Sequence, residues 1–358
     1  SAGAPAPASS PNQPRRRQPR GSLSINPYKP KTMVYAKITG IASYLPDDIL
    51  DNEMLSKMVD TNDEWITTRV GIKERRILRK DVGSSYMGAE AIKRLLAKTG
   101  TAPEEVELII CATSNPDYRF PSTASVIAGL TGATAGYGYD IQAACAGFIV
   151  ALQDAKGYIL SGLYKKVVVV CTEKMSSMIN YEDRSTCALF GDGAAAVLVE
   201  PVESDTPTGV IDAVLHVNPE GMPHLVMPAG GSALPTTIET VKAGQNFLFQ
   251  DGRHVYKHAV TDMLSSTLTI MERNSLTVDT VDWLVPHQAN LRIIEAVASR
   301  AKMPMEKVLV NIEKRGNTSA ASIPICLDEN TDRLKAGDRV VLTAFGAGYT
   351  WGAMYLIW

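Results

Sequence analysis

A cysteine lies among small residues in the stretch Asp140-Ile141-Gln142-Ala143-Ala144-Cys145-Ala146-Gly147-Phe148. A helical pattern begins at Gly147, so we expect the Cys145 thiol at a helix N-terminus, where the helix dipole favours the thiolate. Small neighbours let a substrate carbonyl come close, and the Cys145 N–H could contribute to an oxyanion hole. Cys145 is therefore a candidate nucleophile, although a cysteine in apolar surroundings, taken alone, is more often a packing residue.

Two further side chains complete a set that could perform nucleophilic catalysis. His287 follows an apolar strand pattern in Val285-Pro286-His287-Gln288-Ala289-Asn290, 142 residues after the cysteine. Strand ends are where α/β proteins place reactive groups. Asn317 follows a glycine turn, 30 residues after His287. Each could instead be structural, as a hydrogen-bonded histidine and a turn-forming asparagine, but Cys, His and Asn together indicate catalysis by a thiol.

The elements that must position these residues follow an α/β pattern. Short β-branched runs alternate with longer helical stretches from Met33 onward, as a layered α/β protein requires. The segments 106–111 and 166–171 are apolar enough to be strands that are buried on both faces. Helices are predicted for 84–98 and 147–160.

The second half of the chain repeats the first. Residues 103–110 have a counterpart at 278–285, each a short acidic lead into an apolar strand. Residues 163–169 parallel 334–341, and the Phe-Gly turn with its following strand at 190–199 parallels 345–357. Three matches in the same order predict an internal duplication, with halves at 33–205 and 206–358. The boundary is placed where Pro, Ser and Asp cluster, near 201–208.

The first 32 residues differ from the rest. They hold seven of the 20 prolines and six basic side chains without an acid, so we expect a disordered leader. Met33 resembles a native start that opens a strand, which favours a tag or a mis-assigned start over an organellar transit peptide. No apolar segment follows the arginines, which excludes a secretory signal.

Composition excludes several classes of protein. With 45% hydrophobic residues, the 358-residue chain is neither disordered nor fibrous. Residues 33–358 carry 30 basic and 38 acidic side chains, a net charge of −8 that argues against a general nucleic-acid binder. Five cysteines without a C-x-x-C pair suit a reducing, intracellular setting. We predict no membrane span, because the uncharged run 120–139 is diluted by glycines, a proline and hydroxyl residues.

Two motifs suggest cofactors but do not fit them. Gly191-Asp192-Gly193-Ala194-Ala195-Ala196 imitates a dinucleotide-binding fingerprint, but a strand pattern follows where a helix is needed. His254 and His258 stand at i, i+4 without the glutamate of a zinc-protease helix. We therefore expect neither a metal nor a cofactor.

Several strings in the chain resemble one family, the β-ketoacyl-acyl-carrier-protein synthase III enzymes of type II fatty acid synthesis. These strings are AACAGF, PHQAN, RGNTSAASIP, TNDEWITTRVGIKERR, DRSTCALFGDGA and FGAGYTWG, and the resemblance runs from about Met33 to Trp358. Within the wider superfamily, an asparagine as third residue points to synthase III or its chalcone-synthase-like relatives. The resemblance implies a thiolase fold, which is a duplicated five-layer αβαβα arrangement, and a homodimer.

The resemblance also implies a reaction. Cys145 would take an acyl group from a short acyl-CoA, and malonyl-acyl-carrier protein would decarboxylate to a carbanion that attacks the thioester. His287 and Asn317 would stabilise the enolate as neutral donors. The N–H groups of Cys145 and Ala347 would form the oxyanion hole, provided that the backbone angles at position 347, commonly glycine in the family, allow a Cβ.

Binding roles follow by the same resemblance. Trp65 and Arg184 would sandwich the adenine of CoA, Arg69 would lie near its phosphates, and Asn290 would line the pantetheine tunnel. Phe120 would cross the dimer interface and close the partner's acyl pocket, which favours short or small branched primers.

Lys257, Arg292 and Arg300 are candidates for docking the acidic carrier protein, with a merely solvated face as the alternative. The implied location is the bacterial cytoplasm, or a plastid if the leader is a transit peptide.

Three other functions stay open. A related condensing enzyme of secondary metabolism would condense other acyl-CoA or acyl-carrier substrates, and one that uses malonyl-CoA directly would be indifferent to carrier protein. A cysteine hydrolase would release free acid from the acyl-enzyme, and a non-catalytic scaffold would not be acylated.

Overall fold

The computed structural model describes Gly3 and residues 32–358. The predicted disordered leader, residues 1–32, lies outside the described residues apart from Gly3 and Thr32. The predicted division at 205/206 falls between a strand that ends at Ser204 and one that begins at Gly209. That division stays a prediction.

The first sheet has five strands in the order β1-β7-β6-β4-β5. β4, β6 and β5 are parallel, whereas β7 is antiparallel to both β6 and β1. Their bounds are β1 (Met33–Tyr44), β4 (Leu108–Ala112), β5 (Tyr137–Ile141), β6 (Val167–Lys174) and β7 (Asp192–Ser204). β4 and β6 are buried along their whole length, as their uninterrupted apolar runs predict.

The second sheet repeats this arrangement in the order β11-β12-β13-β8. β11 is parallel to β12, and β13 is antiparallel to both β12 and β8. Their bounds are β8 (Gly209–Val217), β11 (Trp283–Pro286), β12 (Arg339–Gly346) and β13 (Thr350–Ile357). β4, β6 and β7 therefore have the same relations as β11, β12 and β13, which are the three pairs of segments matched in the sequence.

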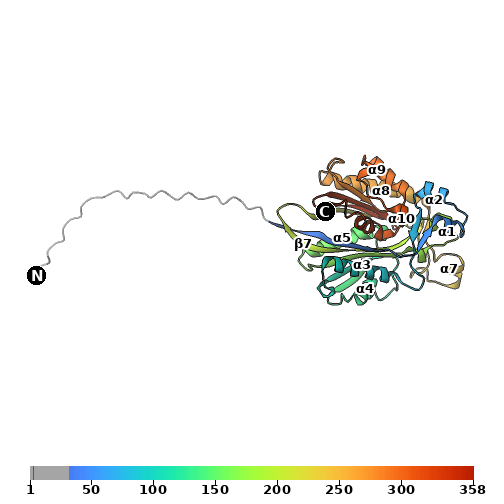
Figure 1. Cartoon of the computed structure of the whole chain (residues 1–358), viewed down its shortest axis with the longest axis horizontal. Helices are drawn as coiled ribbons and strands as arrows, with labels where there is room; N and C mark the ends of the chain where they lie inside the picture. The colour runs from blue at the N-terminus through green and yellow to red at the C-terminus, as the bar shows by residue number, and fades with distance from the viewer. Residues whose placement is uncertain (1–2, 4–31) are drawn as a thin grey trace. The chain divides into compact units, whose positions relative to one another are not determined.

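Helices fill the three layers around the two sheets, as Figure 1 shows. α3 (Ser84–Thr99) and α4 (Thr123–Thr131) cover the outer face of the first sheet, and α8 (Gly252–Arg273) covers the outer face of the second, with α9 (Leu291–Arg300) packed on it. α5 (Gly147–Leu160) and α11 (Ser322–Asp328) lie between the sheets. The predicted five-layer αβαβα thiolase fold is confirmed.

The middle layer explains the composition of α5. Its side chains include Phe148, Ile149 and Leu152, each at most 1% exposed, because the helix contacts strands of both sheets. The apolar part of α5 is enclosed between the sheets, whereas its polar residues are only partly buried. The enclosed helix fixes the short turn before it, which holds Cys145, the predicted nucleophile.

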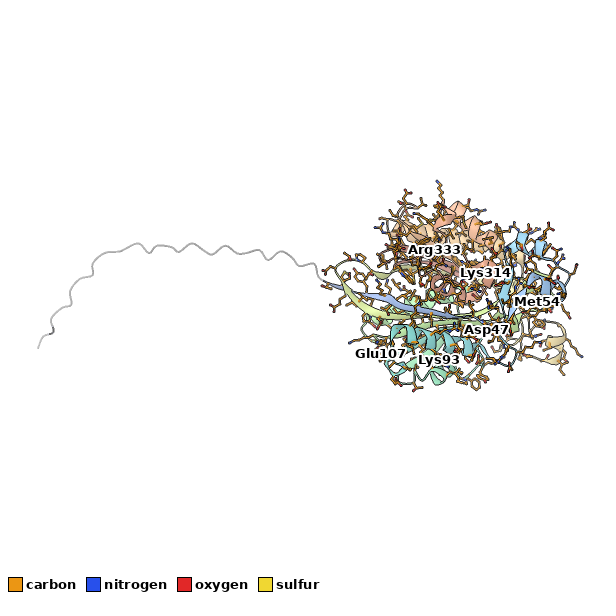
Figure 2. All side chains as sticks on the ribbon, viewed as in Figure 1. Asp47, Met54, Lys93, Glu107, Lys314 and Arg333 are labelled. Atoms are coloured by element: carbon orange, nitrogen blue, oxygen red, sulfur yellow. The ribbon has the colours of Figure 1, made fainter. Side chains whose placement is uncertain are left out.

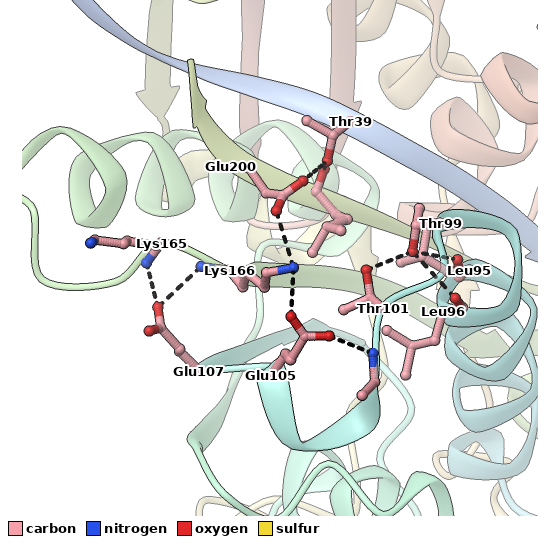
Figure 3. A network of polar contacts seen from close by, with 12 residues as sticks. Thr39, Leu95, Leu96, Thr99, Thr101, Glu105, Glu107, Lys165, Lys166 and Glu200 are labelled. Carbon is pink, nitrogen blue, oxygen red and sulfur yellow. Dashed lines mark hydrogen bonds and ion pairs between the residues drawn. The ribbon is translucent and has the colours of Figure 1, made fainter. Parts of the chain in front are cut away.

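An acidic residue joins neighbouring parallel strands at the same place in both halves. Figure 3 shows Glu107, just before β4, accepting hydrogen bonds from the N–H groups of Lys165 and Lys166, just before β6. Asp282, just before β11, accepts a hydrogen bond of 2.8 Å from the N–H of Arg339 at the start of β12. The acidic leads found in the sequence therefore have equivalent contacts in the two sheets.

Lys166 adds ion pairs to this junction in the first half only. Its Nζ lies 3.2 Å from Glu105 and 3.5 Å from Glu200, so it links the lead into β4 to β7 (Figure 3). Exposed pairs of this kind contribute at most about 1 kcal/mol each.

Smaller elements surround the ends of the strands. They are β2 (Ile49–Asp51), β3 (Glu74–Arg76), β9 (Leu225–Val226), β10 (Phe249–Gln250), α1 (Asn52–Ser56), α2 (Asp63–Val70), α6 (Arg184–Cys187), α7 (Ile238–Lys242), α10 (Ile312–Arg315) and six short 3-10 helices, η1 (Pro103–Glu105), η2 (Ala144–Ala146), η3 (Met175–Met178), η4 (Pro219–His224), η5 (Met305–Lys307) and η6 (Ser319–Ala321). Charged side chains such as Lys93 on α3 and Lys314 on α10 project from the outside of the unit (Figure 2). Within the described residues, no helix has the length and apolarity that crossing a membrane demands.

Candidate active site

One cavity of about 1060 Å³ holds most of the predicted site residues. Its lining includes Cys145, His287, Asn317, Ala347, Trp65, Arg69, Asn290 and Arg292. Arg184 contacts Trp65 from outside this lining, and Phe120, Lys257 and Arg300 do not belong to it. Three residues that are 30 to 172 positions apart in the chain, Cys145, His287 and Asn317, therefore share one enclosed space.

Cys145 lies in η2, directly before α5. The residue before it, Ala144, has a left-handed backbone with φ 45°. Gly346 at the end of β12 packs against this turn so closely that a Cβ there would lie 2.6 Å from the Cys145 nitrogen. A side chain at position 346 would displace the cysteine, so the close approach requires glycine.

A second turn of the same kind faces the first. Ser319, with φ 51°, opens η6, which leads into α11 as η2 leads into α5. The two turns are packed together. A Cβ added at Gly147 would lie 3.1 Å from the Ala320 Cβ, which is closer than an ordinary van der Waals contact. The Sγ of Cys145 lies 3.5 Å from the Ser319 Oγ. The duplication thus places a serine of the second half beside the cysteine of the first.

His287 follows the last residue of β11 and is 1% exposed. Burial lowers its pKa to about 3, so the imidazole is neutral at physiological pH. Its Nδ1 lies 2.6 Å from the Ser322 Oγ, which also accepts the Gln288 N–H at 3.3 Å. We assign the Ser322 hydroxyl as donor to Nδ1, which leaves the hydrogen on Nε2 available to a substrate oxygen.

Asn317 is fixed by both its backbone and its side chain. Its N–H donates to the Leu189 carbonyl at 2.8 Å, and its carbonyl accepts from Gly191 at 3.1 Å. Its Oδ1 accepts the Ser319 N–H at 2.8 Å. Because the amide oxygen is used in this way, the NH₂ group is the end that remains to donate. The preceding Gly316 has φ 63°, as the predicted glycine turn requires.

Burial dominates the electrostatics of the Cys145 thiol. It raises the pKa of Cys145 to about 12, and the nearby Ser319 hydroxyl lowers that pKa only in part. The helix dipole expected from the sequence therefore does not by itself keep this residue as a thiolate. A group that accepts the thiol proton is needed for nucleophilic attack.

The backbone angles at position 347 allow the Cβ of alanine. Among the described residues, the non-glycine positions with positive φ are 144, 275, 302 and 319, and Ala347 is not one of them. Alanine is therefore compatible with this backbone, while the strained conformation falls on Gly348, with φ 135°. The role of the Ala347 N–H in an oxyanion hole stays a prediction.

Trp65 on α2 is surrounded by guanidinium groups. Arg69 lies 5.0 Å and Arg184 lies 5.2 Å from its ring centroid, and Asn62 caps the helix by accepting the Trp65 N–H at 2.8 Å. The Arg184 guanidinium is closer to the ring than an intervening adenine would allow, and it also donates to the Asp60 carbonyl at 3.1 Å. The predicted sandwich therefore requires Arg184 to move outward.

The remaining predicted residues lie nearer the outside. Asn290 lines the cavity and caps α9 by accepting the Arg292 N–H at 2.9 Å. Lys257 on α8, Arg292 and Arg300 on α9 are exposed, and the Arg292 guanidinium lies 5.6 Å from the Tyr256 ring. Phe120 is 85% exposed. Their binding roles stay predictions.

Several lining or supporting residues were not predicted. Ser319 and Ser322 lie within a quoted string, but their contacts depend on how η6 faces η2. Met222, Leu225 and Met227 reach the cavity from η4 and the segment after it, which carries no sequence signal for a site. Glu173, at the end of the apolar run of β6, is fully buried beside Ser319.

The two cofactor-like motifs have other roles. The Gly191 to Ala196 segment leads into strand β7, as expected, so the helix of a dinucleotide site is not present there. His254 stacks between His224 and His258, with ring centroids 3.5 and 4.5 Å away, so these rings do not converge on a point. No cluster of three or more metal-ligating side chains occurs in the described part of the chain.

Comparison with known proteins identifies the family. Models described as 3-oxoacyl-[acyl-carrier-protein] synthase III and its C-terminal region match residues 139–219 and 271–358. The beta-ketoacyl-[acyl-carrier-protein] synthase III 2 of Bacteroides thetaiotaomicron is 53% identical over 326 residues, which cover 91% of this chain and 97% of that protein. The chain belongs to the synthase III family. The relative from Porphyromonas gingivalis W83 is 54% identical, again over 91% of this chain and 97% of that protein.

Solved structures of synthase III enzymes support the same family assignment. That of Aquifex aeolicus VF5 has a TM-score of 0.82 at 42% identity and covers 90% of this chain and all of that one. The priming β-ketosynthase of the R1128 polyketide pathway has a TM-score of 0.83 at 34% identity, covering 92% and 97%. The higher identities belong to the fatty-acid enzymes, so the predicted class of condensing acyltransferase is confirmed and the secondary-metabolism alternative is not favoured.

Proposed function

We propose that this synthase III uses Cys145, His287 and Asn317 to condense a short acyl-CoA with malonyl-acyl-carrier protein, which initiates fatty acid synthesis. The observation that carries the proposal is the cavity itself, in which a thiol and two neutral hydrogen-bond donors face the same space. An acyl-transfer enzyme needs the thiol, and a decarboxylating enzyme needs the donors.

The reaction runs in two steps on one cysteine. The Cys145 sulfur attacks the acyl-CoA carbonyl, the N–H groups of Cys145 and Ala347 bind the oxyanion, and CoA leaves. Malonyl-acyl-carrier protein then enters, and its carboxylate departs as CO₂. His287 Nε2 and the Asn317 NH₂ bind the enolate oxygen that forms, and the resulting carbanion attacks the acyl-Cys145 thioester.

Neutral donors suit this second step. Because burial lowers the pKa of His287 to about 3, the imidazole neither carries a charge that would hold the malonyl carboxylate nor takes up a proton during decarboxylation. No step requires a metal or a bound cofactor, since the enolate charge is met by hydrogen bonds.

The partners follow from the same reaction. Trp65, Arg69 and Arg184 would hold the nucleotide part of CoA, Asn290 the pantetheine arm, and Lys257, Arg292 and Arg300 the carrier protein. A homodimer is supported by β5, which is an edge strand of its sheet, and by two exposed rings, Tyr137 on β5 at 63% and Phe120 in the segment before α4 at 85%. The bacterial relatives favour a bacterial cytoplasm over a plastid.

Acylation of the intact protein tests the proposal. Incubation with acetyl-CoA, isobutyryl-CoA or longer acyl-CoAs should add one acyl group to the mass of the protein. Subsequent malonyl-acyl-carrier protein should remove it as a β-ketoacyl carrier. Release of free acid instead would support a cysteine hydrolase, and no mass increase with any acyl-CoA would remove the initiating role.

Replacing Trp65 tests the CoA contact separately from the chemistry. Trp65→Ala removes the aromatic face but no group near the thiol, so we expect KM for acyl-CoA to rise about 10-fold while kcat changes less than about 2-fold. Steady-state kinetics with acyl-CoA varied would measure both. A fall in kcat with unchanged KM would assign Trp65 to packing of α2 instead.

A further inference from the structure

A buried carboxylate lies behind the Cys145 turn. Glu173, near the end of β6, is 0% exposed, and both its oxygens accept the Ser114 N–H, at 3.1 and 3.0 Å. The Ser319 hydroxyl and the Ala320 N–H lie close enough to this carboxylate to lower its pKa. These partners are all neutral, and an ionisable group is costly to bury without a counter-charge. The condensation steps described above give Glu173 no part.

Ser319 connects this carboxylate to the thiol. Its Oγ lies 3.5 Å from the Cys145 Sγ and also interacts with the Glu173 carboxylate. The packing of η6 against both η2 and β6 brings Ser319 next to the elements that carry Cys145 and Glu173. A hydroxyl can accept one proton while it donates another. A proton can therefore pass from the thiol through the hydroxyl to the carboxylate without movement of heavy atoms.

The thiol needs an acceptor, and the nearest alternative is poor. The pKa of Cys145 is raised to about 12 by burial, and that of His287 is lowered to about 3, so the imidazole is too weak a base. Burial raises the pKa of Glu173 to about 7, against the pull of its hydrogen bonds. Of the two groups that could accept the thiol proton, the Glu173 carboxylate is therefore a stronger base than the His287 imidazole.

We propose that Glu173 takes the Cys145 proton through the Ser319 hydroxyl during acylation and returns it during condensation. The inference rests on the proposed function, since it assigns the proton of that same thiol. Glu173 acts through Ser319 and does not touch substrate, so it is a positioning residue for the proton.

The two half-reactions balance. In acylation, the thiol proton passes to the Ser319 oxygen while the Ser319 proton passes to Glu173. The Cys145 S–C bond forms, the C–S bond to CoA breaks, and CoA leaves as a thiolate that solvent protonates. In condensation, CO₂ leaves, the new C–C bond forms, and the acyl C–S bond to Cys145 breaks. The Cys145 thiolate then recovers the proton from Glu173 through Ser319.

Single-turnover acylation tests the relay. With saturating acetyl-CoA and quenched intact-mass detection, we expect Glu173→Gln and Ser319→Ala to acylate about 10² to 10³-fold more slowly at pH 7. The wild-type rate should rise with pH and level off above about pH 7, where Glu173 is ionised. The Glu173→Gln rate should keep rising to higher pH, because the thiol must then ionise to solvent. Glu173→Asp should restore part of the rate and the plateau.

Two controls separate this role from folding. Asp192 on β7 is another buried carboxylate, bonded to the Leu78 N–H and to Ser176, away from the cavity lining. Asp192→Asn should leave the pH profile of acylation unchanged. In a Cys145→Ala background, Glu173→Gln should leave malonyl-carrier decarboxylation unchanged, which shows an intact site.

The pH dependence of stability gives an independent readout. Burial raises the pKa of Glu173 in the folded protein above its value of 4.5 in a model compound, so the folded state binds the extra proton. Its contribution to stability is full below about pH 4.5 and is lost as pH rises through about 7. The melting temperature of Glu173→Gln relative to wild type should therefore increase from pH 5 to pH 8.

The outcomes distinguish the two levels of inference. If the wild type is acylated, and Glu173→Gln and Ser319→Ala both keep its rate and its pH profile, the relay is wrong and the proposed function stands. Absence of wild-type acylation overturns the proposed function itself. If Glu173→Gln does not fold, Ser319→Ala decides alone, since it keeps the buried carboxylate and breaks only the connection.

Discussion

Cys145→Ala is expected to abolish acyl-enzyme formation and to lower β-ketoacyl-carrier synthesis by at least about 10³-fold. In the proposed mechanism the thiol is the nucleophile of the first step, and the Ser319 hydroxyl at 3.5 Å cannot replace it, because an oxyester is harder to form from a weakly acidic alcohol. Intact-mass analysis with acetyl-CoA measures the first effect, and chromatography of the carrier products measures the second.

The same variant should still decarboxylate malonyl-acyl-carrier protein, because the proposed mechanism has His287 and Asn317 stabilise the enolate without the sulfur. Cys187→Ala is the matched control: it removes a free cysteine that is 1% exposed but does not line the cavity, and acylation should continue. An acyl adduct that survives in Cys145→Ala would move the nucleophile to another residue.

Much of the fold was predictable because the duplication is visible in the sequence. The acidic leads before β4 and β11 are short, regular signals, and each makes the same contact with the neighbouring strand. Predicted ranges were close to the observed ones: 147–160 for α5 agrees fully, and 84–98 for α3 is one residue short. Apolar runs and glycine turns report local structure, which is why they sufficed here.

A fourth match between the halves was missed. The turns that precede α5 and α11 have equivalent left-handed residues, Ala144 and Ser319, but the sequences around them share few residue types. What the two turns share is a backbone shape, imposed by packing at the centre of the molecule. Backbone shape of this kind leaves little trace in residue type unless glycine is needed.

The electrostatics of the site were less predictable than its members. The helix pattern after Cys145 suggested an acidic thiol, whereas burial between two sheets raises its pKa. The sequence carries no signal that Glu173, near the end of a strand, is buried, and η6, which packs beside it, lies 146 positions later. Burial depends on contacts between the halves, and a single sequence does not specify them.

Removing the two donors should stop the second half-reaction while sparing the first. We expect His287→Ala and Asn317→Asp each to lower malonyl-carrier decarboxylation about 10² to 10³-fold, and the double variant to fall by less than the product, because both donors bind one oxygen. Asn317→Asp is the sharper change, since its carboxylate can still accept the Ser319 N–H but presents an acceptor where the amide presented a donor.

Single-turnover acylation of these variants by acetyl-CoA should stay within about 10-fold of wild type, because the thiol, Ser319 and Glu173 remain. Decarboxylation by the wild type should show no loss between pH 5 and pH 8 from His287, whose pKa of about 3 keeps it neutral throughout. Ser322→Ala should lower the rate of decarboxylation about 10-fold relative to wild type across this pH range, since the Nδ1 contact that fixes the tautomer of His287 is lost. Acylation that falls as steeply as decarboxylation in His287→Ala would instead make the imidazole the acceptor of the thiol proton, and the separation of roles between His287 and Glu173 would be wrong.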